Sequence, residues 1–485
     1  MHRMRAVQPE REHFDNMSGH TYQLVRDIVI DDSYDVFVAG GGPAGTAAAI
    51  SAARLGAKVL LAEATGCLGG MGTSALVTTF GPMGDGERTL VGGFARELVE
   101  TMHQRGFLGP GVTPDFWHSH YNRWIPFHPE GLKRVLDEKS VEAGVDVRFF
   151  TRVIDAEVEG RKIIGAVTSS VDGYRFIKAK AFVDATGDAA LAALCGAECK
   201  VAGIDWPDTA PSTLCSLYGG INWNDPAYGN DYSGIDEVKK RTRSELLHQA
   251  IDDGHFSQAD RFMPGMNKLG DTIANVNAGH VFGLNGLDSK SLSNGMMEGR
   301  RTAVEYTEFF RKYVPGCENI EHVATAPVMG VRDTRRIVGE FLLTIEDYTA
   351  RRQFPDQICV YNRPPDNHPT NTSVEEYERF KRDFDGDLKL ARGSSVGIPY
   401  SILVPRGWEN LWAAGRCHSS GHQVHGSIRA QSAAYMMGQA AGTAAKQHID
   451  TGQPGCDLDT ERLVAALRAA GCYLPQETLS KTMTR

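Results

Sequence analysis

The chain of 485 residues is 41% hydrophobic and 23% charged, which is typical of a soluble globular protein. Since an ordinary domain contains roughly 100 to 200 residues, this length predicts two or three lobes. A formal net charge of −9 argues against a nucleic-acid or anionic-membrane surface, because both need clustered Lys and Arg.

Cysteine usage and the first segment indicate the compartment. Nine cysteines without a CxxC pair indicate neither a disulfide framework, a zinc ribbon nor an iron–sulfur cluster, and they fit a reducing compartment. Residues 1–27 lack the apolar core of a signal peptide, and no run of about 18 apolar residues follows. We therefore expect a cytoplasmic protein with no membrane partner.

The first patterned segment is a strand, a glycine turn and a helix. The apolar run 35–39 ends in GGGPAG, and the small-residue run 46–55 follows. In such a unit Gly40 permits the tight turn, Gly42 lets the backbone approach a pyrophosphate, and Gly45 lets the helix pack on the strand. A second strand, 58–62, ends in Glu63, where an acid would bind ribose hydroxyls. This pattern predicts a Rossmann-type dinucleotide site and leaves FAD and NAD open.

Two later segments favour FAD over NAD. A β-meander is expected over 145–177, with turns at Gly160, Gly165 and Gly173, and a strand then closes on an ATGD turn at 185–188. Another strand, 410–416, ends in glycine and precedes a small-residue helix around 438–445. A nicotinamide domain would not need this distant return to the first unit.

At these motifs the chain resembles the FAD-dependent oxidoreductases of the large two-domain flavoprotein group, over about residues 33–448. The resemblance rests on EAxxxLGGMGT at 63–73, the ATGD turn, residues 330–340, and 414–445 with its GQAAGTAA helix. It implies that the glycine turn holds the FAD pyrophosphate, that Glu63 binds the adenosine ribose and that the backbone at Val153 receives the adenine. It also implies further cofactor contacts at Pro43, Ala44, Ala64, Gly69, Gly70, Gly72, Thr73, Thr186, Gly187, Asp188, Gly415, Arg416, Ala433 and Ala434. Of these, the 69–73 loop would pass beside the isoalloxazine.

The sequence HGxxR at 425–429 is similar to an element of fumarate reductase and succinate dehydrogenase flavoproteins, in which the arginine grips a substrate carboxylate. Those proteins continue with Leu-Gly-Gly-Asn, whereas this chain has AQSAA. A helix beginning near Ser432 would direct its N–H groups at the N1 and O2 edge of the ring. Relatives that attach flavin covalently carry a histidine where this chain has GGM at 69–71, so we expect non-covalent FAD.

Candidates for the catalytic base lie in residues 416–425, which contain Cys417, His418, His422 and His425. We favour His425, then His422, because flavin dehydrogenation usually needs a base near the ring. The alternatives are that these histidines satisfy loop carbonyls, or that they ligate zinc. Gly421 and the lack of a CxxC or HExxH frame oppose zinc, and no metal is expected.

A second cluster contains Arg332, Arg335 and Arg336. We expect Arg332 to grip an anion, and the alternative is an exposed helix face paired with Asp333 and Glu340. The aromatic stretch 117–124 is interpreted as core, with a substrate wall as the weaker alternative. Cys67 is expected to be a buried packing residue rather than a redox thiol.

The fold class expected is α/β, with a discontinuous Rossmann-type FAD-binding domain and a second, mixed α+β substrate or cap domain. The FAD-binding domain is assigned to residues 31–79, 127–201 and 398–448, and the cap to 80–126 and 202–397, of which 352–389 is expected to be a surface excursion. Residues 1–30 form an extension and 449–485 a tail with a helix.

These features predict an FAD-dependent dehydrogenase or oxidase that moves a hydride from a small organic substrate to flavin N5. His425 would be the base, and Arg429 and Arg332 would be the anion grips. The alternatives are a reductase of an activated double bond fed by an external donor, and a flavin-binding electron-transfer or RNA-modification partner; the net charge opposes the latter. No second GxGxxG follows a strand in the cap, so oxygen, a small acceptor or a partner protein would reoxidise the flavin. A homo-oligomer is left open.

Overall fold

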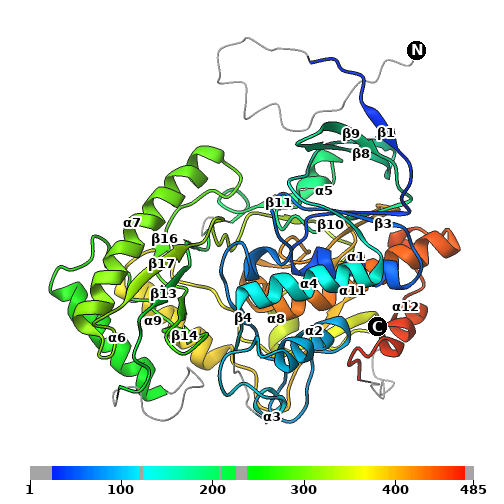
Figure 1. Cartoon of the computed structure of the whole chain (residues 1–485). Coiled ribbons are helices and arrows are strands. Elements are labelled where there is room, and N and C mark those ends of the chain that lie inside the picture. Colours follow the sequence, from blue (N-terminus) through cyan, green and yellow to red (C-terminus); the bar gives the residue numbers. More distant parts are fainter. Residues whose placement is uncertain (1–23, 120–123, 207–208, 226–236, 476–485) are drawn as a thin grey trace.

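A five-stranded parallel sheet lies at the centre of the larger lobe in the computed structural model, which describes residues 24–119, 124–206, 209–225 and 237–475 (Figure 1). The predicted strand, glycine turn, helix and strand are confirmed, and the strands from the ATGD turn and from 410–416 join the same sheet. In spatial order the strands are β21 (Leu411–Ala413), β10 (Ala181–Asp184), β2 (Val36–Ala39), β3 (Val59–Ala62) and β6 (Asp146–Arg148).

Alternation along the strands makes this sheet the middle of three layers. Val36 and Val38 pack against helices on one face, whereas Phe37 and Ala39 pack against the meander on the other, because successive side chains point to opposite faces. The helical layer contains α1 (Pro43–Arg54), α2 (Gly93–Gln104), α4 (Pro129–Ala143), α11 (Gln431–Thr451) and α12 (Thr460–Ala469).

The small-residue motif of α11 is explained by its contact with α1. A Cβ at Gly438 would lie 2.0 Å from the Ala44 carbonyl oxygen, and one at Gly442 would lie 2.1 Å from that of Ala48. Only glycine permits two helix backbones to approach so closely. This contact places Gly438, two turns into α11, beside the start of α1, although almost 400 residues separate the two positions in sequence.

The opposite face of the sheet carries the predicted meander. Gly160 and Gly173 adopt positive φ at its turns, as expected. The expected turn at Gly165 is wrong, because Gly165 lies within β8, where a Cβ would stand 2.4 Å from the Phe176 ring. The strands are β1 (Val29–Asp31), β9 (Gly173–Ile177), β8 (Lys162–Ser170) and β7 (Arg152–Glu159), beside the short helix α5 (Ala190–Leu194).

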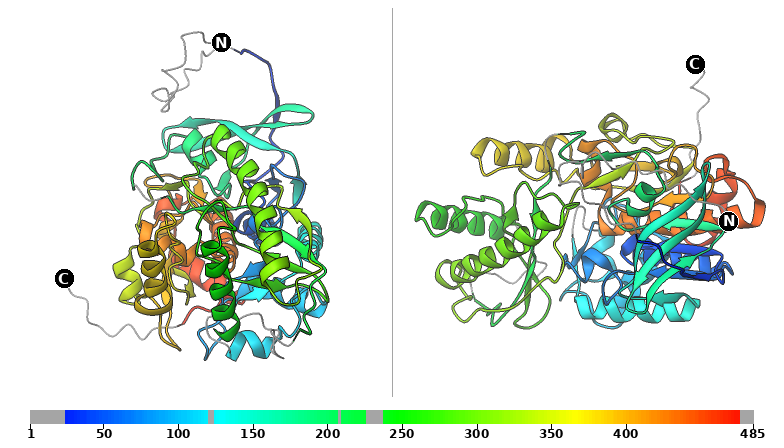
Figure 2. Two further views of the ribbon diagram at one scale, coloured as in Figure 1. Left: turned by 90° about the vertical axis from the view of Figure 1, so that its left-hand side faces the viewer. Right: turned by 90° about the horizontal axis from the view of Figure 1, so that it is seen from above.

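A second lobe, mixed in α and β structure, lies beside the sheet and not on one of its faces (Figures 1 and 2). Phe309 and Phe310 of its long helix pack with Tyr218 of its antiparallel sheet. Its elements include β14 (Met266–Lys268), β15 (Ala274–Val276), β13 (Ser216–Gly219), β17 (Glu321–Thr325), α6 (Glu237–Asp252) and α7 (Ser289–Tyr313).

Shorter elements complete the structure. They include the helices α3 (Pro114–Ser119), α8 (Ile345–Thr349), α9 (Val374–Arg382) and α10 (His422–Ile428). The paired strands are β4 (Thr79–Phe80) with β5 (Ile125–Pro126), β11 (Cys199–Val201) with β18 (Arg335–Ile337), β12 (Ser212–Thr213) with β16 (His280–Val281), and β19 (Gln357–Tyr361) with β20 (Val396–Pro399).

The expected surface excursion at 352–389 is wrong for its first half. Every residue of β19 is buried, and Ile358 and Tyr361 belong to the same core as α11. The helix α2 also packs in that core. Thus α2 and β19, which the sequence placed in the cap, contribute to the core of the larger lobe; the limits of the two domains stay a prediction. Along the described ranges, none of the helices is long and apolar enough to cross a bilayer.

Candidate active site

A cavity of about 1210 Å³ extends from the glycine turn of the larger lobe to the helices of the second lobe. Typical small-molecule sites occupy about 300 to 1,000 Å³, so this space can hold a large cofactor and a substrate together. Most of the expected cofactor residues line it: Gly40, Gly42, Pro43, Ala44, Glu63, Ala64, Gly70, Val153, Thr186, Gly187, Asp188, Gly415, Arg416 and Ala434.

The glycine turn shows why each glycine is needed. A Cβ at Gly40 would lie 2.5 Å from the Ala185 carbonyl oxygen, and a Cβ at Gly45 would lie 1.7 Å from the Gly40 carbonyl oxygen. Gly42 differs, because a Cβ there meets no protein atom within 4 Å and would project toward the cavity that Gly42 lines. Gly42 is also the N-cap of α1 and no side chain caps that end. This open, electropositive helix end fits a pyrophosphate.

The acid at the end of β3 lies farther along the same wall. Glu63 accepts hydrogen bonds from the Gly41 N–H at 2.6 Å and from the N–H and hydroxyl of Thr65, each at 2.7 Å. These bonds fix the carboxylate beside the glycine turn. Thr151 and Val153 line the adjoining part of the cavity, which suits the adenosine half of a dinucleotide.

Arg416 connects the two other glycine turns. Its Nε donates to the Gly187 carbonyl at 2.8 Å, and its Nη2 pairs with the Asp188 carboxylate. Beneath them, Asp184 accepts from the N–H and hydroxyl of Thr186 at 3.0 and 2.7 Å. The ATGD turn is therefore shaped by a buried carboxylate and an ion pair.

In the loop at residues 69–73, which is expected beside the isoalloxazine, some residues line the cavity and others hold the loop in place. Gly70 and Met71 line the cavity, whereas Gly69, Gly72 and Thr73 do not. Gly69 has φ of 98°, and the Thr73 hydroxyl donates to the Leu68 carbonyl at 2.6 Å, so these residues hold the loop from behind. Gly45 and Ala433 are likewise buried in packing contacts outside the wall.

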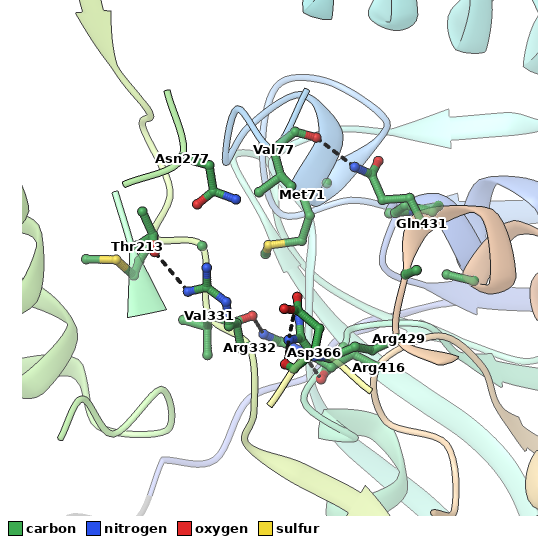
Figure 3. Close-up of a pocket in the computed structure, with 18 of the residues that line it drawn as sticks. Met71, Val77, Thr213, Asn277, Val331, Arg332, Asp366, Arg416, Arg429 and Gln431 are labelled. Atoms are coloured by element: carbon green, nitrogen blue, oxygen red, sulfur yellow. Dashed lines mark hydrogen bonds and ion pairs between the residues drawn. The ribbon is translucent and has the colours of Figure 1, made fainter. Parts of the chain in front are cut away.

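The start of α11 supplies the wall opposite this loop. The helix begins at Gln431, one residue before the expected start, and no side chain caps it. The Gln431 amide donates to the Val77 and Thr79 carbonyls at 2.7 and 3.0 Å (Figure 3). A flat ring between Gly70 and Ala434 would lie within reach of this helix end.

The far part of the cavity is lined by charged side chains from distant segments. Arg332 is buried, and its Nη1 donates to the Pro211 carbonyl at 2.7 Å and to the Thr213 hydroxyl at 2.8 Å (Figure 3). Arg429 donates to the Asp366 carbonyl at 3.0 Å. Arg363 pairs with the Asp366 carboxylate at 2.8 Å. The sequence patterns indicated Arg332 and Arg429 but not Arg363, Asp366 or His368, which lie in the segment interpreted as surface.

Comparison with known proteins decides the family. The profile of the family described as "FAD dependent oxidoreductase" matches residues 35–467. The chain belongs to this family. Its cofactor is FAD, and the glycine turn, the Glu63 wall and the open helix ends provide a site that fits this dinucleotide. The non-covalent attachment stays a prediction.

Several solved flavoprotein structures show a distant likeness to this FAD-dependent oxidoreductase. A geranylgeranyl bacteriochlorophyll reductase-like protein from Thermoplasma acidophilum is 14% identical, with 92% of this chain and 85% of that chain covered and a TM-score of 0.46. The myxobacterial chondrochloren halogenase CndH is 14% identical (91% and 79% covered, TM-score 0.44). The p-nitrophenol 4-monooxygenase PnpA from Pseudomonas putida is 10% identical (91% and 82% covered, TM-score 0.44). Their reactions differ from one another, and likenesses at this level do not indicate the reaction of this enzyme.

The expected catalytic histidines of this flavoenzyme lie outside the cavity wall. The Nε2 atom of His425 is 2.9 Å from the Arg416 carbonyl oxygen, and its ring faces His418. Burial, with the nearby Arg336, holds the pKa of His425 well below its usual range. His422 is a third exposed and faces the Trp206 ring. These positions do not fit the role of base, and for His425 the alternative of a satisfied loop carbonyl describes the observed contact.

The arginine cluster is not an exposed helix face. Residues 335–337 form β18, and Arg336 is 2% exposed with its guanidinium carbon 3.8 Å from the centre of the Trp206 ring. Arg335 donates to the Asp188 carbonyl at 3.0 Å. Arg332 alone of the three lines the cavity.

The remaining candidates divide between core and wall. Trp117 is buried in the core and Trp124 lines the cavity, while residues 120–123 lie outside the described residues. Cys67 is half-buried, with Sγ 3.2 Å from the Ser74 hydroxyl. Within the described residues, no group of His, Cys, Asp and Glu has a geometry that could hold a metal ion.

Proposed function

We propose that this flavoenzyme oxidises a small organic anion that has an activated C–H bond. The observation that supports the proposal is the imbalance of buried charge at the far part of the cavity. There Arg332, Arg363 and Arg429 face the cavity with a single carboxylate, Asp366, among them. Three positive charges against one negative charge leave an excess of two.

The charge state of these groups supports an anionic substrate. Burial lowers the pKa of Arg429 to about 9, opposed by the attraction of Asp366, so its guanidinium stays protonated at neutral pH. Burial also lowers the pKa of Arg332, whose two hydrogen bonds go to neutral acceptors. Asp366 and Asp260 attract Arg332 without bonding to it, and a buried cation whose hydrogen bonds all go to neutral groups is costly; a carboxylate of the substrate would reduce that cost.

Each of these residues has a distinct part in substrate binding. Arg332, held by the Pro211 carbonyl and Thr213, is oriented before the substrate enters. Arg363 is held by its ion pair with Asp366 and by a cation–π contact in which its guanidinium carbon lies 4.6 Å from the centre of the Trp124 ring. Bound FAD supplies the hydride acceptor, its N5 atom. Preoriented guanidinium groups favour catalysis because they need no rearrangement when the substrate binds.

The experiment is an anaerobic screen in which hydroxy acids, amino acids, uncharged sugars and unsaturated acids are mixed with the enzyme and loss of the visible flavin band is recorded. We expect bleaching by an acid of one of these classes. Bleaching by uncharged sugars alone would refute the anionic substrate. Reoxidation of photoreduced enzyme by unsaturated acids, with no bleaching by any reduced compound, would instead identify a double-bond reductase.

A pair of arginine substitutions tests the proposed grip. Arg332→Met should raise the Kd of the anionic substrate about 10- to 150-fold, since a hydrogen bond to a charged group contributes about 1.5–3 kcal/mol. Arg336→Met removes an equally buried arginine that does not line the cavity, and should leave this Kd unchanged. Equal effects of both substitutions would contradict the assignment.

A further inference from the structure

A continuous row of four titratable side chains, three of them buried, begins at the substrate part of the cavity. Asp366 Oδ1 lies 3.0 Å from His368 Nε2, and His368 Nδ1 lies 2.8 Å from His280 Nε2. His280 Nδ1 in turn lies 3.2 Å from Asp260 Oδ2. Asp366 and His368 line the cavity, whereas His280 and Asp260 lie behind them, 1% and 7% exposed. We call this row the Asp–His chain.

The number of protons that the Asp–His chain can hold follows from its geometry. Its three contacts each need one proton to be a hydrogen bond, whereas two neutral imidazoles carry only two. Because the 2.8 Å contact between the two histidines is a hydrogen bond, it holds one proton, and one of the two outer contacts then places a nitrogen lone pair against a carboxylate oxygen. A third proton completes the row. The chain is therefore a site with room for one more proton than its neutral histidines provide.

The surroundings indicate which contact lacks the proton. The Asp366 carboxylate is compensated by Arg363 at 2.8 Å and Arg429 at 3.5 Å. Asp260 is compensated less: its carboxylate accepts from the backbone N–H groups of His280 and Phe262, and the cation that attracts it is Arg332, which bonds to Pro211 and Thr213 instead. The proton on His280 Nδ1 therefore stabilises Asp260 more than a proton on His368 Nε2 stabilises Asp366. The empty contact is the one at the cavity wall.

Other groups around the chain are charged or titratable. Burial, and after it the charge of Arg332, lowers the pKa of His368 to about 3, against the opposing attraction of Asp366. Tyr306 faces Asp260, and burial holds the pKa of its hydroxyl well above its usual range. The Phe262 ring stacks on His280 with centroids 5.2 Å apart. Thr213, which holds Arg332, pairs with His280 between β12 and β16, so the anion grip and the chain share one rigid element.

We propose that the Asp–His chain takes up the proton that leaves the substrate's hydroxyl or amino group while the neighbouring C–H bond is oxidised. The inference rests on the proposed function. The C–H electron pair leaves as hydride to the flavin, the O–H or N–H proton enters the contact between His368 Nε2 and Asp366, and a C=O or C=N bond forms. Both hydrogens and both electrons are accounted for. His368 is the catalytic residue, and His280 and Asp260 are positioning residues that fix its tautomer.

Substitution of the two histidines tests the proposal in the FAD-loaded enzyme with the acid that the screen identifies. His368→Gln keeps an amide at the wall but cannot accept a proton, and should slow flavin reduction about 10²- to 10⁴-fold. His280→Gln should cause a smaller loss. The rate of the wild-type enzyme should rise with pH through the apparent pKa of the chain, and His280→Gln should shift this rise. His255→Gln, a half-buried histidine bonded to the Glu305 carbonyl, is the control and should change neither rate nor profile.

A spectroscopic measurement separates this proposal from the proposed function. Imidazole N–H protons in short hydrogen bonds give far-downfield proton NMR signals, which can be recorded on the FAD-loaded enzyme without substrate. We expect one such signal to change with pH and to disappear in both His368→Gln and His280→Gln, but not in His255→Gln. If no downfield signal depends on these two residues, or if His368→Gln reduces flavin at the wild-type rate, the chain is not the proton acceptor. A wild-type enzyme that no compound bleaches would overturn the proposed function while this signal still reports on the chain.

Discussion

Alanine at Gly42 should separate FAD binding from folding. Gly42 has φ of −67° and ψ of −173°, which alanine adopts without strain, and its added Cβ meets no protein atom within 4 Å. We therefore expect the free energy of unfolding of the apoprotein to stay the same or to rise by up to about 1 kcal/mol, because alanine restricts the unfolded chain. The Cβ projects instead toward the space that the FAD pyrophosphate would occupy.

The magnitude of the effect on FAD follows from the cost of one extra carbon in a filled site. Such overpacking costs about 1–3 kcal/mol, which corresponds to a Kd for FAD about 5- to 150-fold higher. Gly45→Ala is the contrasting substitution. Its Cβ would lie 1.7 Å from the Gly40 carbonyl oxygen, so the fold itself must shift, and unfolding should become easier by about 3 kcal/mol or more.

The assay has two independent readouts. Quenching of FAD fluorescence on addition of apoprotein gives the Kd, and urea unfolding of the same apoprotein gives the stability. Gly386→Ala is the control, since its Cβ also meets no atom within 4 Å and Gly386 does not line the cavity. If Gly42→Ala binds FAD as tightly as the wild type, the pyrophosphate does not pass Gly42 and the placement of the cofactor fails.

Two further predictions concern the stability of the sheet lobe. Gly442→Val should lower the free energy of unfolding by about 3 kcal/mol or more, because its Cβ would lie 2.1 Å from the Ala48 carbonyl oxygen. The control is Asp450→Ala, at an exposed position of the same helix, which should change this free energy by less than about 0.5 kcal/mol. Comparable losses of the two variants in urea unfolding would contradict the close contact of α1 and α11. His418 donates to the Gly415 carbonyl, and burial lowers the pKa of His418 from 6.5 to about 4, so the folded state excludes a proton that the unfolded state binds. Stability should therefore fall as pH decreases from 6.5 to about 4, and His418 should account for about 3 kcal/mol of that loss. The measurement is the urea midpoint of a His418→Asn variant over this pH range. A midpoint that falls as steeply as that of the wild type would refute the assignment.

The nucleotide-binding unit could be predicted because its requirements are local. A strand, a glycine turn and a helix N-terminus lie within a dozen residues, and steric limits at Gly40 and Gly45 act between atoms close in sequence. The assignment of the 410–416 strand to the same sheet was also correct, since its glycine end repeats the pattern of the first turn. By contrast, Gly165 was misinterpreted because glycine also serves where a neighbouring aromatic ring, here Phe176, leaves no room for a Cβ.

The chemistry beside the flavin site depended on contacts that no local pattern records. His425 follows in sequence a strand that ends at the cavity wall, yet α10 turns its ring toward the Arg416 carbonyl and away from the cavity. Arg363, Asp366 and His368 lie in a polar segment rich in proline and asparagine, which is typical of exposed loops. The buried strand β19 carries that segment into the cavity wall, where these residues meet Arg332 and Arg429.

The sequence by itself determined the βαβ unit, the FAD family and the close packing of the GQAAGTAA helix, because glycine spacing and small residues encode steric conditions that few folds satisfy. Tertiary structure alone decided which polar residues share the substrate part of the cavity. His280 and His368 are 88 residues apart, and their hydrogen bond exists only because β16 and the segment after β19 converge behind Arg332. Burial then gives these groups their altered proton affinities, and burial is a property of the assembled lobes rather than of any short stretch of sequence.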